Sequence, residues 1–222
     1  MSKRLRIPKI NNEEYFRSLG FKNIVGVDEV GRGSWAGPIV AAAVKLPNNK
    51  RLYNLRDSKL LSAKIREQLA KKIKKVAQCG IGVVNASEIN KIGLTESLSQ
   101  AYELALNNLK IKSDFILIDG NRIKNSVIPQ KAIIKGDMQC ASIAAASIIA
   151  KTFRDKLMRT LGKKFPKYHL DKNKGYGTKE HQKALKKYGA SEIHRDYRPI
   201  RYIKSKIKEK RLKIKIKNER YF

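Results

Sequence analysis

The sequence predicts an α/β fold, because short apolar runs of strand length alternate along the chain with longer segments that have the apolar spacing of helices. The chain has 222 residues, and 41% of them are apolar, which is enough for one well-buried domain with some appended structure. Carboxylates recur where the predicted strands end. Ligands of α/β sheets collect outside the carboxyl ends of strands, so this pattern predicts a functional site at one edge of the sheet.

The predicted elements are defined by apolar periodicity and by the turn residues between them. In chain order they are a basic adapter over residues 1–20 with a short helix at 12–19, strands at 22–28 and 39–46, a helix at 62–76, a strand at 79–84, helices at 87–92 and 95–109, strands at 115–118 and 132–134, and a helix rich in small residues at about 139–161. Ser62 is the predicted N-cap of its helix. The face of the 95–109 helix that carries Leu98 and Tyr102 is expected to be ordinary core.

The charge balance indicates the class of partner. Fifty Lys and Arg against nineteen Asp and Glu give a net charge of +31, far more than solubility requires, so a polyanion is the expected partner. A Lys-rich composition inherited from a biased genome explains part of the lysine but not its concentration near the C-terminus. The chain has no run of eighteen apolar residues and no hydrophobic signal core, so we expect a soluble, cytoplasmic protein without membrane contact.

Neither the cysteines nor the histidines have the spacing of metal ligands. Cys79 and Cys140 lack CxxC spacing and are expected to be buried thiols in a reducing compartment. His169, His181 and His194 also share no ligand spacing, and we expect them to be hydrogen-bonded structural residues.

Two adjacent carboxylates, Asp28 and Glu29, lie where the first predicted strand enters a turn rich in glycine. Successive strand side chains point to opposite faces, so the two can converge only where the strand ends or bulges. Gly31 and Gly33 flank Arg32, which lets the backbone turn tightly, expose its N–H groups and bring a guanidinium close to an anion. This arrangement is typical of a hard-metal site beside a phosphate or sugar. The alternative is a hairpin whose exposed turn carries ordinary solvating charges.

Two further carboxylates occupy comparable positions. Asp119 follows four apolar residues, so it is either a carboxylate delivered by a strand tip or an ordinary β-turn residue. Asp137 precedes the helix at 139–161, where it either caps the helix or binds metal. With Asp28 and Glu29 they carry four negative charges, which two divalent ions would balance and which would repel one another without metal. This balance favours a two-metal phosphodiesterase site, in which ions about 3.5–4 Å apart activate water and stabilise the leaving oxygen.

An ordered set of motifs between residues 22 and 200 resembles the type 2 ribonucleases H, specifically bacterial ribonuclease HII. Each motif is unspecific alone, whereas the ordered set is very specific. The matching pieces are Gly26-Val27-Asp28-Glu29-Val30-Gly31-Arg32-Gly33 with Ala36-Gly37-Pro38, Asp57-Ser58-Lys59, Leu117-Ile118-Asp119-Gly120, Lys135-Gly136-Asp137, the small-residue run at 142–155, Lys174-Gly175-Tyr176-Gly177-Thr178 and His194-Arg195. Ser34-Trp35 stands where the family usually has smaller or aliphatic residues, a departure that bears on substrate positioning rather than on activity.

The resemblance implies a ribonuclease H-like fold, with a five-stranded mixed sheet flanked by helices and a small helical C-terminal part. It assigns residues 21–200 to the catalytic domain, with 168–200 as a substrate-contacting part, and 201–222 to a Lys/Arg-rich tail. The implied activity is endonucleolytic cleavage of the RNA strand of RNA–DNA hybrids and cleavage 5′ of ribonucleotides embedded in duplex DNA, leaving 3′-hydroxyl and 5′-phosphate ends. By this likeness, two Mg²⁺ or Mn²⁺ ions are held by Asp28, Glu29, Asp119 and Asp137.

By the same likeness, the backbone around Gly31, Arg32 and Gly33, together with Tyr176, reads the 2′-hydroxyl at an RNA-to-DNA junction. A 2′-hydroxyl is what distinguishes RNA from DNA locally, and peptide groups in a glycine turn can reach it. The alternative for Tyr176 is an aromatic that anchors a flexible loop. Three cations are candidate phosphate contacts or supports of the site, with a solvated or structural role as the alternative for each: Lys59, Lys151 and Arg195.

Beyond Pro199 the chain alternates basic and apolar residues at high charge density. This pattern predicts either a mobile arm along a phosphate backbone or a solubilising tail. We expect a monomer that binds nucleic acid, with a replication clamp as a candidate further partner. A non-catalytic binding protein would have lost one or more of the four carboxylates, and all are present. The sister enzyme ribonuclease HIII carries an extra N-terminal domain, whereas about twenty residues precede the first predicted strand here.

Overall fold

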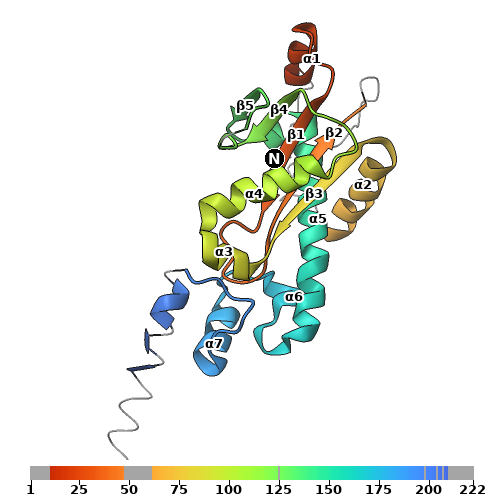
Figure 1. The fold of residues 1–222 in the computed structure, drawn as a ribbon. Coiled ribbons are helices and arrows are strands. Elements are labelled where there is room, and N and C mark those ends of the chain that lie inside the picture. Colours follow the sequence, from red (N-terminus) through yellow and green to blue (C-terminus); the bar gives the residue numbers. More distant parts are fainter. Residues whose placement is uncertain are drawn as a thin grey trace, which may run out of the picture. The chain divides into compact units, whose positions relative to one another are not determined.

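The protein is described by a computed structural model that covers residues 11–47, 62–124, 126–197, 199–203, 205–206 and 208–209. The chain forms two compact units (Figure 1). The first unit comprises residues 1–32, 39–84 and 94–154, and the second comprises residues 33–38, 85–93 and 155–222. Each unit therefore combines segments that are far apart in the sequence.

The first unit is built on a five-stranded mixed sheet with the order β3-β2-β1-β4-β5. β1 pairs antiparallel with β2 and parallel with β4, while β2 and β3 are antiparallel and β4 and β5 are parallel. The strands are β1 at Ile24–Val30, β2 at Ile39–Lys45, β3 at Gln78–Val84, β4 at Phe115–Asp119 and β5 at Gln130–Ile133. The predicted α/β fold with a five-stranded mixed sheet is thus confirmed.

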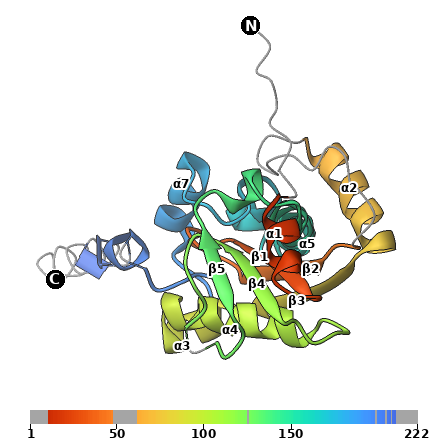
Figure 2. The same ribbon diagram turned by 90° about the horizontal axis from the view of Figure 1, so that it is seen from above.

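Helices cover both faces of this sheet (Figure 2). Helix α4, at Leu94–Asn107, lies so close to β3 that a Cβ at Gly82 would be 1.9 Å from the Ala101 carbonyl oxygen. On the other face, α5 at Ala141–Lys164 crosses β1, where a Cβ at Gly26 would be 2.1 Å from the Ser142 carbonyl carbon. Both helices therefore touch the sheet at positions that only glycine fills without displacing backbone.

Two further helices complete the first unit. Helix α2, at Ala63–Val76, has the expected N-cap Ser62 and packs Ile73 into a buried cluster with the alanines of α5. Helix α1, at Asn11–Ser18, stacks Phe16 on Phe115 of β4 with ring centroids 4.0 Å apart. The predicted helix near residues 12–19 is present, but it belongs to the core of the first unit rather than to a separate adapter.

The second unit is small and helical. Its elements are α3 at Ala86–Ile92, the 3₁₀ helix η3 at Pro166–Tyr168, α6 at Leu170–Asn173 and α7 at Lys179–Tyr188, and it also receives the last turns of α5. Its buried cluster includes Leu185 of α7, Ile200 and Ile203. The small helical C-terminal part is therefore confirmed, and its core includes one residue, Ile203, that the sequence placed in the tail.

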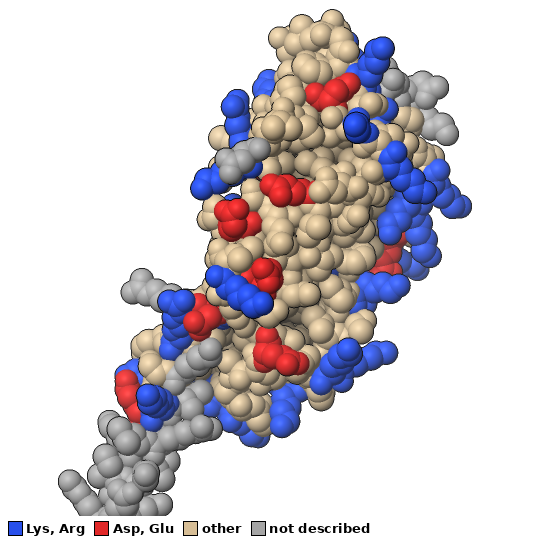
Figure 3. Space-filling view, viewed as in Figure 1, with Lys and Arg blue, Asp and Glu red and all other residues tan. Residues whose placement is uncertain are grey.

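The surface of the first unit is strongly basic along α2. Figure 3 shows Lys and Arg side chains gathered over this helix, whose exposed lysines are Lys64, Lys71, Lys72, Lys74 and Lys75. Among the described residues, no helix is long and apolar enough to cross a membrane.

Candidate active site

Strands β1 and β4 carry two acids to the same edge of the sheet. Their parallel register pairs Val27 with Ile118, and the next residue on each strand is an acid, Asp28 on β1 and Asp119 on β4. Side chains at matching positions of neighbouring strands point to the same face, so the two carboxylates are neighbours. Asp119 is the last residue of β4, which agrees with a carboxylate at a strand tip.

The two adjacent acids of β1 point to opposite faces. The prediction that the strand ends at residue 28 is wrong, because the β1–β2 ladder continues without a bulge to the pair Val30–Val40. Asp28 lies on the α5 face and accepts a hydrogen bond from the Ser147 side chain. Glu29 lies on the α4 face, where its Oε2 accepts a hydrogen bond from the Tyr102 hydroxyl. Each acid is therefore held by a different helix.

Burial and mutual repulsion make these carboxyl groups reluctant to ionise. The pKa of Asp28 is raised well above its usual value, first because the group is buried and then because Glu29 and Asp119 are negatively charged neighbours. The pKa of Glu29 is also raised, mainly by burial, while Tyr102 and Arg32 oppose the shift. Three acids thus act on one another electrostatically within a poorly solvated edge of the sheet.

The fourth acid, Asp137, reaches this edge through a tight turn after β5. Lys135 has the left-handed φ of 55°, and the short 3₁₀ helix η2 at Gly136–Met138 follows it. The Gly136 N–H donates to Asp119 Oδ1 at 2.7 Å, so the residue before Asp137 is bonded directly to another of the acids. Asp137 itself is buried and lies in η2, before α5 begins.

These residues fit divalent metal ions by their chemistry. Carboxylate oxygens are the ligands that Mg²⁺ and Mn²⁺ prefer. Burial raises the pKa of Asp28 and repulsion by Glu29 and Asp119 adds to it, and a bound cation would offset that repulsion. Within the part of the chain that the structure describes, no three acidic, histidine or cysteine side chains are already grouped at metal-binding spacing. Glu29 and Asp119 instead accept protein hydrogen bonds, from Tyr102 and from the Gly136 N–H. Each of these hydrogen bonds uses one oxygen of a carboxylate that has two, so acceptor capacity for a metal ion is left on both side chains.

The glycine turn follows directly from β1. Gly31 has a φ of 91°, which favours glycine, and Arg32 is exposed beside Glu29, whose pKa it lowers. Gly33 begins the first segment of the second unit. Lys151 lies on α5 one turn after Ser147, so the two residues share a helix face. Lys59 lies outside the described residues.

The remaining predicted contacts belong to the second unit. Tyr176 keeps 37% of its surface exposed in the loop before α7. Arg195 is fully buried, and its guanidinium donates to the Gly37 carbonyl at 2.9 Å and to the Tyr197 hydroxyl at 3.1 Å. These surroundings therefore favour a structural role for Arg195 over a phosphate contact.

The expectation of hydrogen-bonded structural histidines is confirmed for His181 and His194 and stays a prediction for His169. His181 and His194 are buried, with their Nε2 atoms 3.1 Å apart, whereas His169 is exposed. Both cysteines are at least partly buried, and burial raises the pKa of Cys79 to about 11 and that of Cys140 to about 12. Neither thiol is poised to react at neutral pH.

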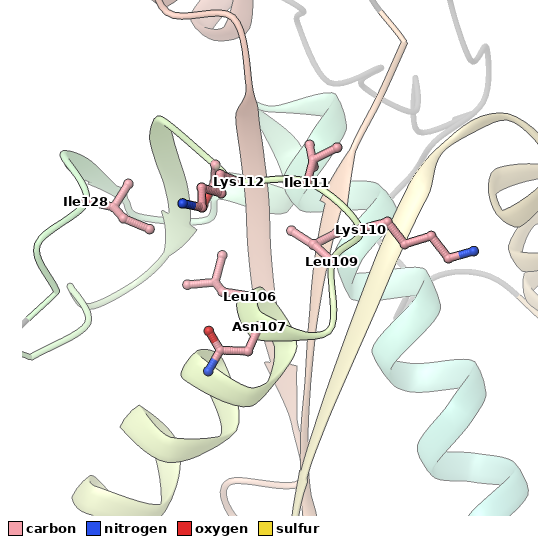
Figure 4. Close-up of a pocket in the computed structure, with 8 residues that line it drawn as sticks. Leu106, Asn107, Leu109, Lys110, Ile111, Lys112 and Ile128 are labelled. Carbon is pink, nitrogen blue, oxygen red and sulfur yellow. The ribbon is translucent and has the colours of Figure 1, made fainter.

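A pocket elsewhere in the first unit is distinct from the acidic edge. It has a volume of about 500 Å³ and is lined by the end of α4, including Leu106, and by the loop that follows, including Lys110 and Lys112, together with Ile128 (Figure 4). This loop leads into the first residue of β4, whereas Asp119 is the last. The acids therefore do not line this pocket.

Two residues that hydrogen-bond to the acids were not predicted as site residues from the sequence. Tyr102 has the spacing of an ordinary core residue and is buried as expected, but its hydroxyl is bonded to Glu29. Ser147 stands among the alanines of α5, where nothing in the local pattern separates it from a small packing residue. A buried phenol or hydroxyl usually has a partner, which is the signal that could have directed attention to both.

Comparison with known proteins decides the family. The ribonuclease HII family model matches residues 25–204, which is more than half of the chain. The chain belongs to the ribonuclease HII family. Enzymes of this family hydrolyse the RNA strand of RNA–DNA hybrids and depend on divalent metal ions, so the chain is a nuclease of the ribonuclease H type.

Individual relatives agree with this assignment. The ribonuclease HII of Chlamydia caviae is 46% identical over 194 residues, covering 86% of this chain and 91% of that protein. The crystal structure of ribonuclease H2 from Pyrococcus horikoshii OT3 matches with a TM-score of 0.72 and 26% identity, over 84% of this chain and 99% of that one. The ribonuclease HII of Archaeoglobus fulgidus, solved in complex with PCNA, matches with a TM-score of 0.69 and 26% identity, over 80% and 95% of the two chains.

Proposed function

We propose that this ribonuclease H also cuts 5′ of single ribonucleotides embedded in duplex DNA, and that it does so with two divalent ions held by Asp28, Glu29, Asp119 and Asp137. The observation that carries the metal site is the pair Asp28 and Asp119, which follow the register pair Val27–Ile118 on neighbouring parallel strands. The raised pKa of Asp28 supports it, because the shift comes first from burial and then from the negative charges of Glu29 and Asp119 close by.

The chain's own residues prepare this site before metal arrives. Ser147 and the Glu29 N–H both donate to Asp28, which fixes the orientation of that carboxylate. The Gly136 N–H, at 2.7 Å, fixes Asp119 in the same way. When bound, Mg²⁺ or Mn²⁺ would activate the attacking water and stabilise the leaving 3′-oxygen, giving 3′-hydroxyl and 5′-phosphate products. The exposure of Arg32 at the start of the glycine turn supports a role for its guanidinium in binding phosphate.

The metal site is tested by Asp119→Asn. This change removes one ligand charge while keeping the volume and one acceptor oxygen for the Gly136 N–H. Cleavage of an RNA–DNA hybrid should fall below about a tenth of the parent rate at saturating Mg²⁺, with the melting temperature and substrate binding largely kept. Asp114→Asn is the matched control, because Asp114 precedes β4 and accepts from the Lys22 and Asn23 N–H groups. Parent-like cleavage by Asp119→Asn would remove Asp119 from the metal site.

The substrate proposal assigns reading of the 2′-hydroxyl to the glycine-turn backbone and to Tyr176. It is supported by the accessible phenol of Tyr176 and by the φ of 91° at Gly31. Tyr176→Ala should lower kcat/KM on a duplex with one ribonucleotide by about tenfold or more, and Tyr176→Phe should be intermediate. A long hybrid offers many registers, so the loss there should be smaller. Equal losses on the two substrates would assign Tyr176 to loop structure alone.

Three further expectations belong to this proposal. The PCNA complex of the Archaeoglobus fulgidus relative supports a sliding clamp as a partner of this chain, which titration of the purified protein with a clamp would test. We propose a monomer, which light scattering would check. The cytoplasmic location expected from the sequence stays a prediction.

A further inference from the structure

The loop that carries Tyr176 has a backbone that is held by hydrogen bonds on both sides of this residue. The Tyr176 N–H donates to the Asn173 carbonyl at 3.0 Å, and its own carbonyl accepts from the Thr178 N–H at 2.8 Å. The preceding Gly175 N–H donates to Asn173 Oδ1 at 2.8 Å, and Asn173 is buried. A loop with a glycine on each side of its aromatic residue would otherwise be flexible. Here the backbone is fixed while the ring remains accessible.

The segment Trp35–Ala36 holds this loop from a distant part of the chain. The Trp35 and Ala36 N–H groups both donate to the Gly175 carbonyl, at 2.8 and 3.1 Å. A Cβ at Gly177 would lie 2.4 Å from two atoms of the indole, so the Trp35 ring is packed directly against the backbone that follows Tyr176. A smaller side chain at position 35 would leave this backbone without its support.

Two buried histidines hold the loop through hydrogen bonds whose direction can be deduced. The Ser191 N–H donates to His194 Nδ1 at 3.0 Å, so in the neutral ring the proton lies on Nε2. That N–H faces His181 Nε2 at 3.1 Å, which must accept, and the proton of His181 is then on Nδ1. His181 Nδ1 lies 2.9 Å from the Tyr176 carbonyl oxygen and donates to it.

The surroundings of the two rings favour this arrangement. His181 is fully buried, and burial lowers its pKa, so the ring stays neutral as the chain of bonds requires. The Tyr168 ring packs edge-on against His194, with centroids 4.6 Å apart, and the indole of Trp35 lies 6.3 Å from the His181 ring centroid. The histidine pair and the indole therefore form one support beneath the Tyr176 loop.

We propose that Trp35 and the hydrogen-bond chain from His194 through His181 are positioning residues for Tyr176, and that they set how strongly this enzyme prefers a single embedded ribonucleotide. The inference rests on the proposed junction-reading role of Tyr176. A duplex with one ribonucleotide offers a single 2′-hydroxyl, which the Tyr176 phenol can contact in only one register of the enzyme on the duplex. A displaced phenol therefore loses this contact. A long hybrid offers neighbouring ribonucleotides that tolerate the displacement.

The test compares two substrates in the full-length protein. Trp35→Leu and His181→Phe should each lower the ratio of kcat/KM on a single-ribonucleotide duplex to kcat/KM on an all-RNA hybrid by about threefold to tenfold. Trp35→Phe keeps a ring against Gly177 and should restore most of the ratio. Ile200→Ala is the matched control, because Ile200 is buried in the same unit but makes none of these contacts. It should lower the melting temperature and leave the ratio unchanged.

A spectroscopic measurement reads the same loop directly. Trp35 is the only tryptophan of the sequence, so all tryptophan emission comes from the support of the Tyr176 loop. His181→Phe should make this emission easier to quench with acrylamide, whereas Ile200→Ala should not. Trp35→Leu leaves the hydrogen bonds of the two histidines in place. If His181→Phe does not fold, the ratio of kcat/KM on the two substrates is therefore measured with Trp35→Leu.

The outcomes separate this inference from the function on which it rests. If Tyr176→Ala leaves the ratio unchanged, junction reading by Tyr176 fails and the positioning proposal fails with it. If Tyr176→Ala lowers the ratio while Trp35→Leu and His181→Phe do not, junction reading stands and the positioning proposal is overturned.

Discussion

The acidic edge of the first unit and the Tyr176 loop of the second are held in different ways. Asp28 and Asp119 lie on regular strands, and one parallel register places them side by side. The Tyr176 loop has no regular secondary structure. Residues 35–36 hold it from a distant stretch of the chain, and Asn173 and His181 hold it from either side, with the distant His194 bonded to His181. Chemistry that must work on every substrate is thus placed on a rigid sheet, whereas the proposed selection of substrate depends on a loop with long-range supports. Changes to the first region should affect all substrates, and changes to the second should affect their ranking.

The largest expected effect comes from a pair of glycine substitutions, one in each region. In Gly26→Ala the new Cβ would meet the backbone of α5 at 2.1 Å, which displaces the helix that bears Ser147. We expect a loss of about 3 kcal/mol or more in the free energy of unfolding, and loss of activity on every substrate. In Gly177→Ala the new methyl meets a side chain, the Trp35 ring, at 2.4 Å. A smaller loss of stability, with a preferential loss on the single-ribonucleotide duplex, is expected.

Denaturant unfolding and two-substrate kinetics measure both variants. Gly33→Ala is a control for the stability measurement only, because a Cβ there would meet nothing within 4 Å, whereas its backbone belongs to the proposed substrate contact. If Gly177→Ala lowered activity equally on both substrates, the contrast between the two regions would disappear.

A smaller effect is expected from Tyr102→Phe, which removes one hydroxyl from the acidic edge. The change keeps the buried ring and removes the hydrogen bond to Glu29. That hydrogen bond lowers the pKa of the Glu29 carboxyl group, so its loss should raise this pKa further. We expect a loss of about tenfold in kcat/KM on all substrates together with a higher Mg²⁺ requirement, because Glu29 is left without its fixed partner. Metal titrations of the initial rate provide the measurement. An unchanged Mg²⁺ requirement would make Tyr102 a packing residue only.

The pH dependence of stability should have opposite signs in the two regions. In metal-free protein the pKa of Asp28 is above its unfolded value near 3.8, so its folded state binds more protons and stability falls as pH rises above about 4. The pKa of His181 is below its unfolded value of 6.5, so its contribution is fully present above that pH and is lost as pH falls below it.

Melting temperatures against pH in the presence of EDTA test these signs. Asp28→Asn should stabilise the metal-free protein more at pH 7 than at pH 4, and Mg²⁺ should remove that advantage because it stabilises only the carboxylate form. A gain that is the same at both pH values would show that burial and the neighbouring acids do not raise the pKa of Asp28 in the folded protein.

The smallest effect concerns the basic tail, and it separates a phosphate-binding arm from a solubilising tail. Because Ile203 packs into the second unit, a clean deletion should begin after residue 209 and remove 210–222. If this segment follows a phosphate backbone, affinity for every duplex should fall together. The slope of log K against log salt should then shrink by about 0.9 for each phosphate that the shortened protein no longer neutralises. Binding titrations at several salt concentrations measure the slope, and an unchanged slope would favour the solubilising tail.

Local sequence determined the elements and the identity of the acids. Apolar runs predicted all five strands, and the five helices that were predicted have ends within a few residues of their expected positions, because burial on one or both faces imposes those periods on the chain. Helices α6 and α7 were not predicted as separate elements. Asp119 could be placed at a strand tip for the same reason. What local sequence missed was the regular continuation of β1 to Val30, because the pairing with β2 that sustains it is a contact between strands.

The partners of the acids and the support of the loop were decided only by the tertiary structure. Tyr102 and Ser147 look like packing residues within their own helices, and only the crossing of α4 and α5 over β1 brings them to Glu29 and Asp28. The segment 33–38 follows the catalytic strand in the sequence but folds into the second unit, where Trp35 meets Gly177. Periodicity reports which face of an element is buried and carries no information about which distant residue covers it. For that reason the acids and Tyr176 could be predicted from the sequence, whereas the residues that contact and hold them are known only from the tertiary structure.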